Sequence, residues 1–482
     1  MPETLFDVIV IGGGPTGENV ANRVVKGGLT AAIIESRLVG GECAYYACSP
    51  SKALLRSSAA LEAARRVDGA KQAITGSLDP IAVLARRTRF TDSWRDDNQV
   101  TWLESAGIAL VRGQGRIAGE RKVAVEGTDG SVIGLTARQA VVICTGSDPA
   151  LPSIPGLSDA SPWTNREATR ADRIPPRLAV LGGGPVACEL AQAFRSLGTK
   201  EVTILNRGDR LLEQMEPFVS DRIAEVFRDL GIAVHTSAKV TRVQRSGPGT
   251  PVQVWFDGPG AASSTLEADE ILVATGRVPS TKNIGLETVA LKPGDWLQVD
   301  DTCRVTSVAG GWLYAAGDVN HRALLTHIGK YQARACGDAI VARAKGELNG
   351  TPEPWSRWAA TADHSAVPQV VFTDPEVAFV GLTEAKAKQA GLRVRAAEYD
   401  MSHISGAKLV ADGYEGHANL LIDEDRHVIV GATLIGQDVG ELIHAFTVAV
   451  VGEVPLDRLW HAVPSFPTMS EIWLRLLESY GR

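Results

Sequence analysis

Cysteine is scarce in this chain, with six residues among 482. They are Cys43, Cys48, Cys144, Cys188, Cys303 and Cys336. Only the first two lie close together, unlike the framework of a disulfide-stapled secreted domain or a zinc site with paired CxxC ligands. A single close pair is typical of a protein from a reducing compartment that uses its cysteines catalytically. We therefore expect a cytoplasmic protein without a metal site.

Basic runs and long apolar runs are also missing. The formal net charge is −7, and no stretch interleaves basic with aromatic residues, which argues against a nucleic-acid partner. No apolar run approaches the ~20 residues that a membrane-spanning helix needs, and the first residues form no signal-peptide pattern. We therefore expect neither nucleic acid nor membrane among the partners. Hydrophobic residues make up 44% of the chain, enough for the cores of about three ordinary domains.

The chain does contain a nucleotide-binding pattern near its start. A buried strand, a glycine-rich turn, a helix and a second strand ending in an acid are predicted around residues 7–11, Gly12, Gly14, Gly17 and Glu35. Such glycines allow a tight turn and the close approach of a pyrophosphate to a helix N-terminus, and the acid suits ribose hydroxyls. Because all four parts agree, we predict a dinucleotide site here.

The same pattern occurs a second time. Its strand and turn are residues 178–181, Gly182, Gly184 and, where the third glycine stood, Ala187. The next strand ends in Asn206, followed by Arg207 and Arg210. An acid would repel a 2′-phosphate whereas arginines would pair with it, so the pattern favours NADPH over NADH. The alternative is that both arginines are solvated surface charges.

Further strands with polar ends accompany the two copies. They end at Thr145 and Gly146, at Gly276, and at Gly317 and Asp318. We expect Asp318 to meet ribityl or ribose hydroxyls of the first cofactor, and His327 to lie at the start of the next helix.

Helical spacing extends over residues 53–100, and short strands are predicted within residues 108–145. From residue 368 the pattern changes to strands (370–372, 394–400, 418–423 and 428–435) followed by helices (438–452 and 468–479). This indicates an α+β domain without a nucleotide fingerprint. The helix over 438–452 is so apolar that it suggests a subunit interface.

Cys43 and Cys48 lie in the segment GGECAYYACSPSK. This spacing aligns poorly on a regular helix, so a disulfide would need a distorted first turn and would be strained and reducible. A helix N-terminus would stabilise the thiolate once the bond opens. The residues alone leave two interpretations open, a redox-active disulfide fed by the nucleotide sites or two unrelated buried cysteines.

The ordered motifs GGGPTG with Glu35, GGECAYYACSPSK, GGGPVACE, ATGRVPS, YAAGDV and FTDPE resemble the class I flavoprotein disulfide reductases. This pyridine nucleotide-disulfide oxidoreductase family includes dihydrolipoamide dehydrogenase, glutathione reductase and mercuric reductase. The resemblance covers essentially the whole chain and implies an α/β fold with two Rossmann-like domains and a C-terminal α+β dimerisation domain. It also implies a homodimer, with an FAD domain over 1–150 and 281–355, an NAD(P) domain over 151–280 and a dimerisation domain over 356–482.

The resemblance further implies FAD in the first site and NADPH or NADH in the second. Cys48 would be the thiol nearest the flavin, Cys43 the interchange thiol that attacks substrate, and Lys52 with Glu189 a charged pair near flavin N5. Electrons would pass from NAD(P)H through the flavin to the disulfide, and then to substrate by thiol–disulfide exchange. The expected cofactor contacts are Gly12, Gly14, Gly17, Glu35, Gly41, Lys52, Thr145, Gly146, Gly182, Gly184, Ala187, Arg207, Arg210, Gly276, Gly317, Asp318 and His327.

The chain departs from the family where thiol–disulfide members carry a histidine paired with a glutamate. Here Phe466 takes the histidine position, while Glu471 remains. The histidine is an acid/base group of the kind that contributes roughly 10²–10⁴-fold. His461 would substitute if its loop folds back, and the alternative is an ordinary loop histidine. Mercuric reductases resemble this chain in having an aromatic here, but the chain lacks their paired C-terminal cysteines.

Two tyrosines are a further departure, because Tyr45 and Tyr46 stand between the cysteines. They serve either aromatic packing or a substrate-facing role. We expect His444 to be a core or interface residue. The remaining cysteines are expected to be structural.

The sequence thus predicts an FAD-dependent NAD(P)H oxidoreductase that delivers electrons through Cys43 and Cys48 to an unidentified small-molecule acceptor. We expect weak turnover with lipoamide or glutathione disulfide. The alternatives are a dihydrolipoamide dehydrogenase, a quinone or metal-ion reductase of mercuric-reductase type, and a flavin-bound redox sensor with negligible turnover.

Overall fold

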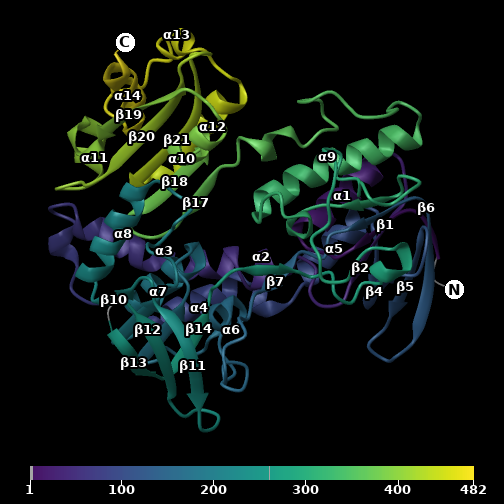
Figure 1. The fold of residues 1–482 in the computed structure, drawn as a ribbon, viewed down its shortest axis with the longest axis horizontal. Helices are drawn as coiled ribbons and strands as arrows, with labels where there is room; N and C mark the ends of the chain where they lie inside the picture. The colour runs from purple at the N-terminus through teal and green to yellow at the C-terminus, as the bar shows by residue number, and fades with distance from the viewer. Residues whose placement is uncertain (1–3, 260, 482) are drawn as a thin grey trace. The chain divides into compact units, whose positions relative to one another are not determined.

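The computed structural model describes residues 4–259 and 261–481. The chain divides into two compact units. Unit 1 comprises Met1–Ser49, Thr88–Asp148 and Arg277–His364, and unit 2 comprises Pro50–Arg87, Pro149–Gly276 and Ser365–Arg482. Figure 1 labels the elements of both. The predicted three-domain division stays a prediction.

Unit 1 is built on a seven-stranded sheet with the order β3-β2-β1-β6-β5-β4, and β16 pairs with β6. The strands are β1 (Leu5–Ile11), β2 (Ala31–Glu35), β3 (Ala109–Arg112), β4 (Gln114–Ile117), β5 (Lys122–Glu126), β6 (Val132–Ile143) and β16 (Leu313–Ala315). Its helices are α1 (Pro15–Lys26), α2 (Gly41–Tyr45), α5 (Asp97–Ser105) and α9 (Thr326–Ala344). β7 (Ser147–Pro149) pairs with β15 (Arg277–Pro279) in a small separate sheet.

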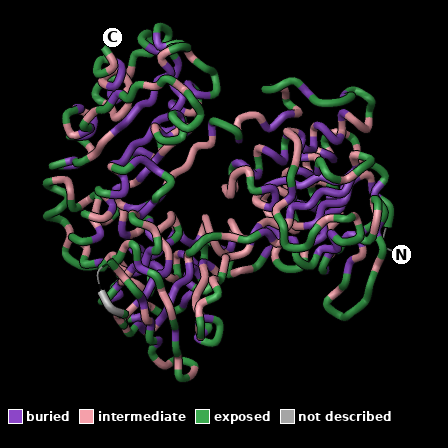
Figure 2. The backbone as a smooth tube through the Cα atoms, viewed as in Figure 1, coloured by how far each residue is buried: buried purple, intermediate pink, exposed green. Residues whose placement is uncertain are grey.

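The centre of this sheet is buried on both faces, as expected of parallel strands covered by helices. Val8, Ile9 and Val10 of β1 are completely buried, and β1 runs parallel to both β2 and β6. Figure 2 shows buried residues concentrated on these strands. The covered sheet places the ends of β1 and β2, with Gly12 and Glu35, at the same edge.

The described part of unit 2 contains three sheets. A parallel one has the order β10-β9-β8-β14, an antiparallel one β11-β12-β13, and a five-stranded one β17-β18-β21-β20-β19. The strands are β8 (Arg177–Leu181), β9 (Glu201–Leu205), β10 (Ile232–His235), β11 (Lys239–Arg245), β12 (Val252–Gly258), β13 (Ala261–Ala268), β14 (Glu270–Val273), β17 (Gln369–Val371), β18 (Glu376–Gly381), β19 (Val394–Asp400), β20 (His417–Asp423) and β21 (Val428–Gly436).

Among the described residues, ten helices lie mostly or wholly in unit 2. They are α3 (Cys48–Arg65), α4 (Pro80–Phe90), α6 (Asn165–Arg170), α7 (Pro185–Ser196), α8 (Pro217–Asp229), α10 (Glu384–Gln389), α11 (Ser405–Val410), α12 (Val439–Val451), α13 (Leu456–Leu459) and α14 (Ile472–Tyr480). Val371, Val377 and Ile435 of the five-stranded sheet share one core with the parallel sheet, so the two sheets are packed together.

Several sequence-based expectations need correction. Turns break the helical stretch predicted over 53–100 into α3, α4 and α5. The prediction also missed β18, which lies at the end of the FTDPE motif, and began the last helix too early, since α14 starts at Ile472. Proline and short polar segments interrupt these regions, and periodicity alone does not resolve such breaks.

Candidate active site: two nucleotide-binding turns and a cysteine pair

The first glycine-rich turn can be built only with glycine at its key positions. Gly12 has φ +108°, and a Cβ there would lie 2.4 Å from the carbonyl oxygen of Cys144. A Cβ on Gly17 would lie 2.0 Å from the Gly12 oxygen. The turn thereby brings the start of α1 close to the strand ends, leaving backbone N–H groups free to face an anion.

Glu35 is held firmly at the end of β2. Its Oε2 accepts a hydrogen bond from the Gly13 N–H at 2.7 Å, and its Oε1 accepts one from the Arg37 N–H at 2.7 Å. This is the place that the nucleotide-binding pattern assigns to a ribose-binding acid.

Further polar groups of unit 1 fit the FAD expected in this site. The buried Thr145 hydroxyl has no hydrogen-bond partner among the described residues, so it is free to bind a ligand. The Asp318 carboxylate accepts a hydrogen bond from Ser147 at 2.6 Å and lies 3.8 Å from Arg277. Gly146 and Gly317 have φ of +72° and +82° beside these groups. The residues present therefore fit a dinucleotide such as FAD.

The second turn repeats the geometry of the first in unit 2. Gly182 has φ +114°, and its Cβ would lie 2.3 Å from the carbonyl oxygen of Ala274. The Asn206 side chain packs against Gly183 as Glu35 packs against Gly13. Gly184 caps α7, and the fully buried Ala187 occupies the position of the third glycine. The predicted internal repeat is therefore present as a structural repeat.

The polar end of this second site differs from the first. Asn206 donates hydrogen bonds to the carbonyl oxygens of Gly208 at 3.3 Å and Arg210 at 2.8 Å. Arg210 itself donates to the Glu213 carbonyl at 3.0 Å, whereas Arg207 is exposed. Arg207 is therefore the arginine more available to a 2′-phosphate. Gly276 has φ +133°, and nothing lies within 4 Å of the position that a Cβ would take there.

The two cysteines lie on two different helices, which corrects the expectation of one helix with a distorted first turn. Cys43 belongs to α2, Cys48 begins α3, and Tyr46 between them leaves the helical region with φ −135°. Both cysteines are half-buried. Cys48 stands at the start of α3, so the positive end of that helix lies at its thiol.

The cysteine segment packs directly against the first nucleotide turn. The Gly40 N–H donates to the Gly13 carbonyl at 2.8 Å, and a Cβ on Gly41 would lie 2.9 Å from Gly14 Cα. Gly40 and Gly41 have φ of +107° and +57°, which favours glycine at both positions. The thiols therefore lie beside the predicted FAD site.

Side chains of α9 face the thiols. The Thr326 hydroxyl lies 3.3 Å from Cys48 Sγ. The pKa of Cys43 is raised, first by its hydrogen bond with Cys48 and then by burial. Thr326 and Lys330 act in the opposite direction on that pKa. His327, one residue after Thr326, is exposed on the same helix.

Tyr45 is a core residue, with 1% of its surface exposed. Its hydroxyl donates to the Arg95 carbonyl at 3.2 Å, and its own carbonyl accepts from Trp94 Nε1 at 3.1 Å. These contacts favour the packing interpretation for Tyr45. Tyr46 is half-buried, with its ring centre 6.3 Å from that of Tyr45.

Lys52 and Glu189 are brought together in unit 2. Lys52 Nζ lies 2.7 Å from Glu189 Oε2 and 4.8 Å from the centre of the Phe372 ring. The Phe372 N–H donates to Glu189 Oε1 at 3.0 Å, so the FTDPE segment fixes the buried carboxylate. The role of this pair near flavin N5 stays a prediction.

Glu471, whose expected histidine partner is replaced by Phe466, is paired with an arginine in this structure. Glu471 is buried, and Arg475 donates to its Oε1 at 2.6 and 3.1 Å. The glutamate thus has a partner that the sequence reasoning missed, although Arg475 is four residues on, a spacing that pairs charges on a helix. Phe466 is 73% exposed. His461 is exposed, and its side chain forms no hydrogen bond with any residue that the structure describes.

One face of α12 is left uncovered in the single chain. His444 is exposed, which makes its assignment to the core wrong. Val448 and Val451 on the same helix are 55% and 37% exposed. The three are spaced by four and three residues, which places them on one side of the helix, so the interface assignment for His444 stays a prediction.

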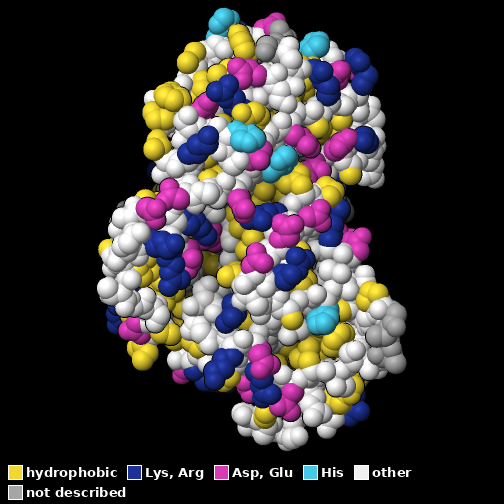
Figure 3. Space-filling view, turned by 90° about the vertical axis from the view of Figure 1, so that its left-hand side faces the viewer, with side chains coloured by type: hydrophobic (Ala, Val, Ile, Leu, Met, Phe, Trp, Pro, Cys, Tyr) yellow, Lys and Arg dark blue, Asp and Glu magenta, His cyan; other side chains and the backbone are white. Residues whose placement is uncertain are grey.

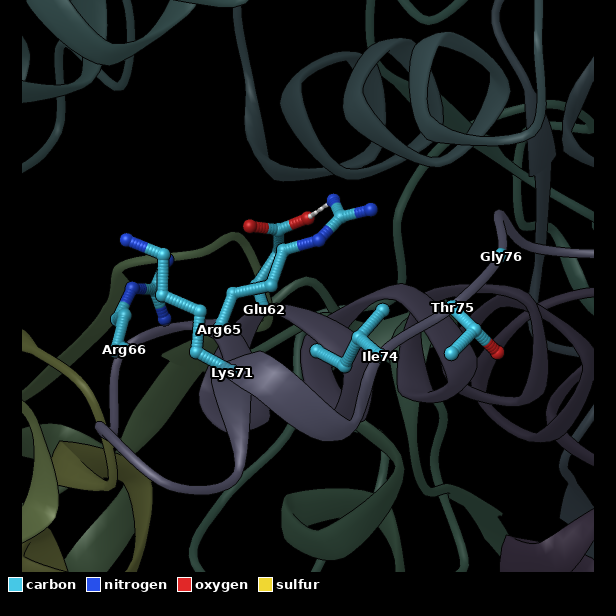
Figure 4. A pocket seen from close by; sticks show the side chains of 7 residues that line it. All are labelled: Glu62, Arg65, Arg66, Lys71, Ile74, Thr75 and Gly76. Carbon is cyan, nitrogen blue, oxygen red and sulfur yellow. Dashed lines mark hydrogen bonds and ion pairs between the residues drawn. The ribbon is translucent and has the colours of Figure 1, made fainter.

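A pocket of about 650 Å³ lies elsewhere in unit 2 (Figure 4). Its lining residues are Glu62, Arg65, Arg66, Lys71, Ile74, Thr75 and Gly76. Both arginines of the lining form ion pairs, Arg65 with Glu62 at 2.5 Å and Arg66 with Asp374 at 2.7 Å. None of the predicted site residues lines this pocket.

Neither a metal centre nor a membrane helix is found in the part of the chain that the structure describes. No group of three or more His, Cys, Asp or Glu side chains there could hold a metal ion. No helix there is both long and apolar enough to cross a bilayer. On the face drawn in Figure 3, acidic and basic side chains are interspersed.

Comparisons with known proteins agree with the geometry. The family "Pyridine nucleotide-disulphide oxidoreductase" matches residues 6–346, and its dimerisation domain matches residues 367–476. A dihydrolipoyl dehydrogenase of Chlamydia muridarum is 31% identical over 474 residues, covering 97% of this chain and 95% of that protein. A mercuric reductase of Staphylococcus aureus is 29% identical over 467 residues, covering 97% of this chain and 81% of that protein.

A solved structure shares the fold. It is the Cu(II) complex of the HOCl-induced flavoprotein disulfide reductase RclA from Escherichia coli, with a TM-score of 0.81, 23% identity and 99% of both chains covered. The predicted fold class, two nucleotide-binding folds with a dimerisation domain, is thereby confirmed. The chain belongs to the pyridine nucleotide-disulfide oxidoreductase family, whose members are NAD(P)H-dependent flavoprotein enzymes.

Proposed function

We propose that this enzyme couples the oxidation of NAD(P)H to the reduction of a Cys43–Cys48 disulfide, with FAD as its prosthetic group, and passes the electrons to a small-molecule acceptor. The observation that carries the proposal is the packing of the cysteine segment against the first nucleotide turn, through the Gly40 N–H bond to Gly13 at 2.8 Å. A thiol pair in that position can exchange electrons with a cofactor held by the turn.

Residues of unit 1 would hold FAD. The turn from Gly12 to Gly17 offers its N–H groups to a pyrophosphate, Glu35 offers its carboxylate to ribose hydroxyls, and the Thr145 hydroxyl and Asp318 offer further polar contacts. When bound, FAD supplies the two-electron exchange between a nicotinamide nucleotide and a dithiol.

The two thiols have different tasks. Cys48 begins α3 and contacts the Thr326 hydroxyl at 3.3 Å, so both the helix dipole and a hydrogen bond favour its thiolate. Cys43 then acts as the thiol that meets the acceptor. When the acceptor takes two electrons, the pair closes to a disulfide and two thiol protons are released.

The acceptor is one that needs no protonated leaving thiol, such as a quinone, a dye, oxygen or a soft metal ion. Two observations support this choice of acceptor. Phe466 stands at the position of the family's acid/base histidine, and the Glu471 carboxylate already accepts a hydrogen bond from Arg475. The curated relatives named mercuric reductase support a soft metal ion among these acceptors.

The second site takes NADPH in preference to NADH. Arg207 is exposed beside β9, where a 2′-phosphate would lie, and the neutral Asn206 replaces the acid that would repel that phosphate. The enzyme works as a cytoplasmic homodimer. The match of residues 367–476 to a dimerisation domain and the exposed valines of α12 support the dimer.

Anaerobic reduction with NADPH or NADH tests the proposal. Thiols are counted before and after addition, and several acceptors are then supplied to the wild type, Cys43→Ser and the matched control Cys188→Ser. We expect two new thiols in the wild type, and loss of acceptor reduction in Cys43→Ser alone. If Cys43→Ser still reduced the acceptor, electrons would reach the acceptor from a group other than Cys43. If the wild type gained no thiols, NAD(P)H oxidation would not be coupled to reduction of the disulfide, and the proposal would be refuted.

A further inference from the structure

Asp318 is carried by a short turn that lies against the first nucleotide site. The turn runs from Gly317, with φ +82°, to Asn320, and is called the Asp318 turn here. A Cβ on Gly317 would lie 2.8 Å from Thr16 Oγ1, at the start of α1. The direction of the Asp318 carboxylate therefore depends on how firmly this turn is held.

One buried oxygen atom holds both ends of the Asp318 turn. It is Oε1 of Gln332, a residue of α9 that is completely buried. This atom accepts a hydrogen bond from the Gly317 N–H at 2.8 Å and another from Asn320 Nδ2 at 2.8 Å. Neither end of the turn can move away without leaving a buried N–H group unpaired, which is costly.

The other end of the Gln332 amide is held by a buried acid. Nε2 of Gln332 donates to Asp363 Oδ2 at 2.8 Å, and Asp363 Oδ1 lies 2.6 Å from the Arg322 guanidinium. Because the Gly317 N–H can only donate and a carboxylate can only accept, these partners determine which way the amide points. The Arg322 N–H also donates to Asn320 Oδ1 at 3.1 Å, which ties the arginine to the turn.

The charge of Asp363 is balanced by neighbours in the same unit. Burial raises the pKa of Asp363, whereas Arg322 lowers it. Arg322 pairs with Asp301 as well, at 2.8 Å, and the ring of the exposed His364 lies 2.7 Å from Asp301 Oδ1. Tyr331 of α9 also faces Asp363, and its hydroxyl is hydrogen-bonded to backbone groups. The cationic partner that contacts the Asp363 carboxylate is thus Arg322.

We propose that Gln332 is a positioning residue for FAD, whose amide, oriented by Asp363, fastens the Asp318 turn so that the Asp318 carboxylate faces the cofactor. The inference rests on the proposed function, because it takes the contact between Asp318 and FAD from there. Gln332 acts only through hydrogen bonds and through another residue, so no bond to the cofactor is formed or broken by it.

The position demands a group that accepts on one side and donates on the other. A hydrocarbon at residue 332 could do neither. In Gln332→Glu the new carboxyl group could accept from the turn, but it would face the carboxylate of Asp363. Two such groups share one proton at low pH and repel each other once that proton is lost at higher pH.

Exchanging the two chemistries should restore the arrangement. In the double variant Gln332→Glu with Asp363→Asn, the new amide can donate to the new carboxylate, which still accepts from both ends of the turn. The amide oxygen can accept from Arg322, and the total charge of the cluster is unchanged. A pair of residues that only filled space would gain nothing from this exchange.

The test measures how fast FAD leaves the loaded protein. The protein is diluted into buffer without FAD, and the rise in fluorescence of the released flavin is followed at about pH 6 and about pH 8.5. Circular dichroism at the same pH values shows that each variant is folded. No nicotinamide nucleotide or electron acceptor is needed, so the measurement is independent of turnover.

Each variant has a distinct expected release rate. Gln332→Met releases FAD about tenfold faster than the wild type at both pH values, because two donors of the turn lose their acceptor. Gln332→Glu releases it about tenfold faster at the higher pH and less than about threefold faster at the lower pH. The double variant returns to within about threefold of the wild type at both.

Asp338→Asn is the matched control. It removes a charge from the same helix, α9, where Asp338 pairs with Arg23 at 2.6 Å and not with the Asp318 turn. We expect its FAD release to stay within about twofold of the wild type at both pH values.

The outcomes separate this inference from the proposed function. A release rate in Gln332→Glu that does not depend on pH, or a double variant that releases FAD as fast as Gln332→Glu or fails to load FAD, refutes the positioning role. The double variant decides the matter even where Gln332→Met does not fold. If the release rates follow the expectation but NADPH generates no new thiols in the wild type, the proposed function fails while the role of Gln332 stands.

Discussion

The guanidinium of Arg475 holds the carboxylate of Glu471 at 2.6 Å. Glu471 is the acid that the family resemblance pairs with a histidine, and here that histidine position is Phe466. The carboxylate is buried and already shares its charge with an arginine one helical turn away. Restoring the histidine alone would therefore leave its expected partner occupied.

We expect the Phe466→His variant to gain less than about threefold in lipoamide reduction, and Phe466→His with Arg475→Gln to gain more than about tenfold, because the second change frees Glu471. Steady-state rates with NADPH and lipoamide measure this. Arg475→Gln alone is the control and should show no gain. A full recovery with Phe466→His alone would show that Arg475 does not compete for the carboxylate.

A methyl group on Gly17 should abolish FAD binding or folding, because its Cβ would lie 2.0 Å from the Gly12 carbonyl oxygen. The ratio of flavin absorbance to protein absorbance in purified Gly17→Ala measures the loss. Gly134→Ala is the matched control, since nothing lies within 4 Å of its Cβ position. Normal flavin content in Gly17→Ala would mean that α1 can move away from the turn.

Glu18 should make stability depend on pH. Its pKa rises from the ordinary 4.5 to about 7 in the folded chain, chiefly through burial. A raised carboxyl pKa means that the folded state holds its proton more tightly than the unfolded state does. Ionisation of Glu18 therefore lowers the free energy of unfolding. This loss is absent below pH 4.5, grows as the pH rises from 4.5 to about 7, and is complete above about 7, where it amounts to at most roughly 3 kcal/mol.

Glu18→Gln removes this loss. We therefore expect the variant to unfold at a higher temperature than the wild type at pH 8 and at nearly the same temperature at pH 4.5. Thermal scans of the FAD-loaded protein at both pH values give the comparison. Glu104→Gln, at an exposed position of α5, serves as the control, and an equal shift at both pH values would count against a titrating Glu18.

Arg207 should decide between the two nicotinamide nucleotides. Removing its charge takes away a partner of the 2′-phosphate, so Arg207→Ala should raise the KM for NADPH about tenfold and leave the KM for NADH unchanged. Lys200→Ala, at an exposed position just before β9, is the matched control. If the KM values for NADPH and NADH changed equally, Arg207 would be a solvated surface charge that does not contact the 2′-phosphate.

The two nucleotide turns were predictable because their chemistry is local. A few glycines within one turn determine where a Cβ would clash, and the contacts of Gly12 and Gly182 are nearly the same. The pairing of Lys52 with Glu189 was expected only through the family resemblance, since the two residues are far apart in the sequence. The family and fold followed from the order of the motifs.

Other relationships were not visible in the sequence. Arg23 and Asp338 are 315 residues apart and belong to no shared motif, so only the packing of α1 against α9 brings them together. The helix break between Cys43 and Cys48 occurs at Tyr46, beside the buried Tyr45, and no periodicity of the sequence indicates it. The Glu471–Arg475 pair does have a signal in the sequence, because a spacing of four residues brings opposite charges together on a helix.

The anchoring of Tyr45 limits how the backbone of the cysteine segment can move. Tyr45, which stands between the cysteines, is fixed at both its hydroxyl and its carbonyl, by Arg95 and Trp94. A disulfide that joins Cys43 and Cys48 would therefore have to close and open mainly through rotation of the two cysteine side chains, because the chain between them is held in place.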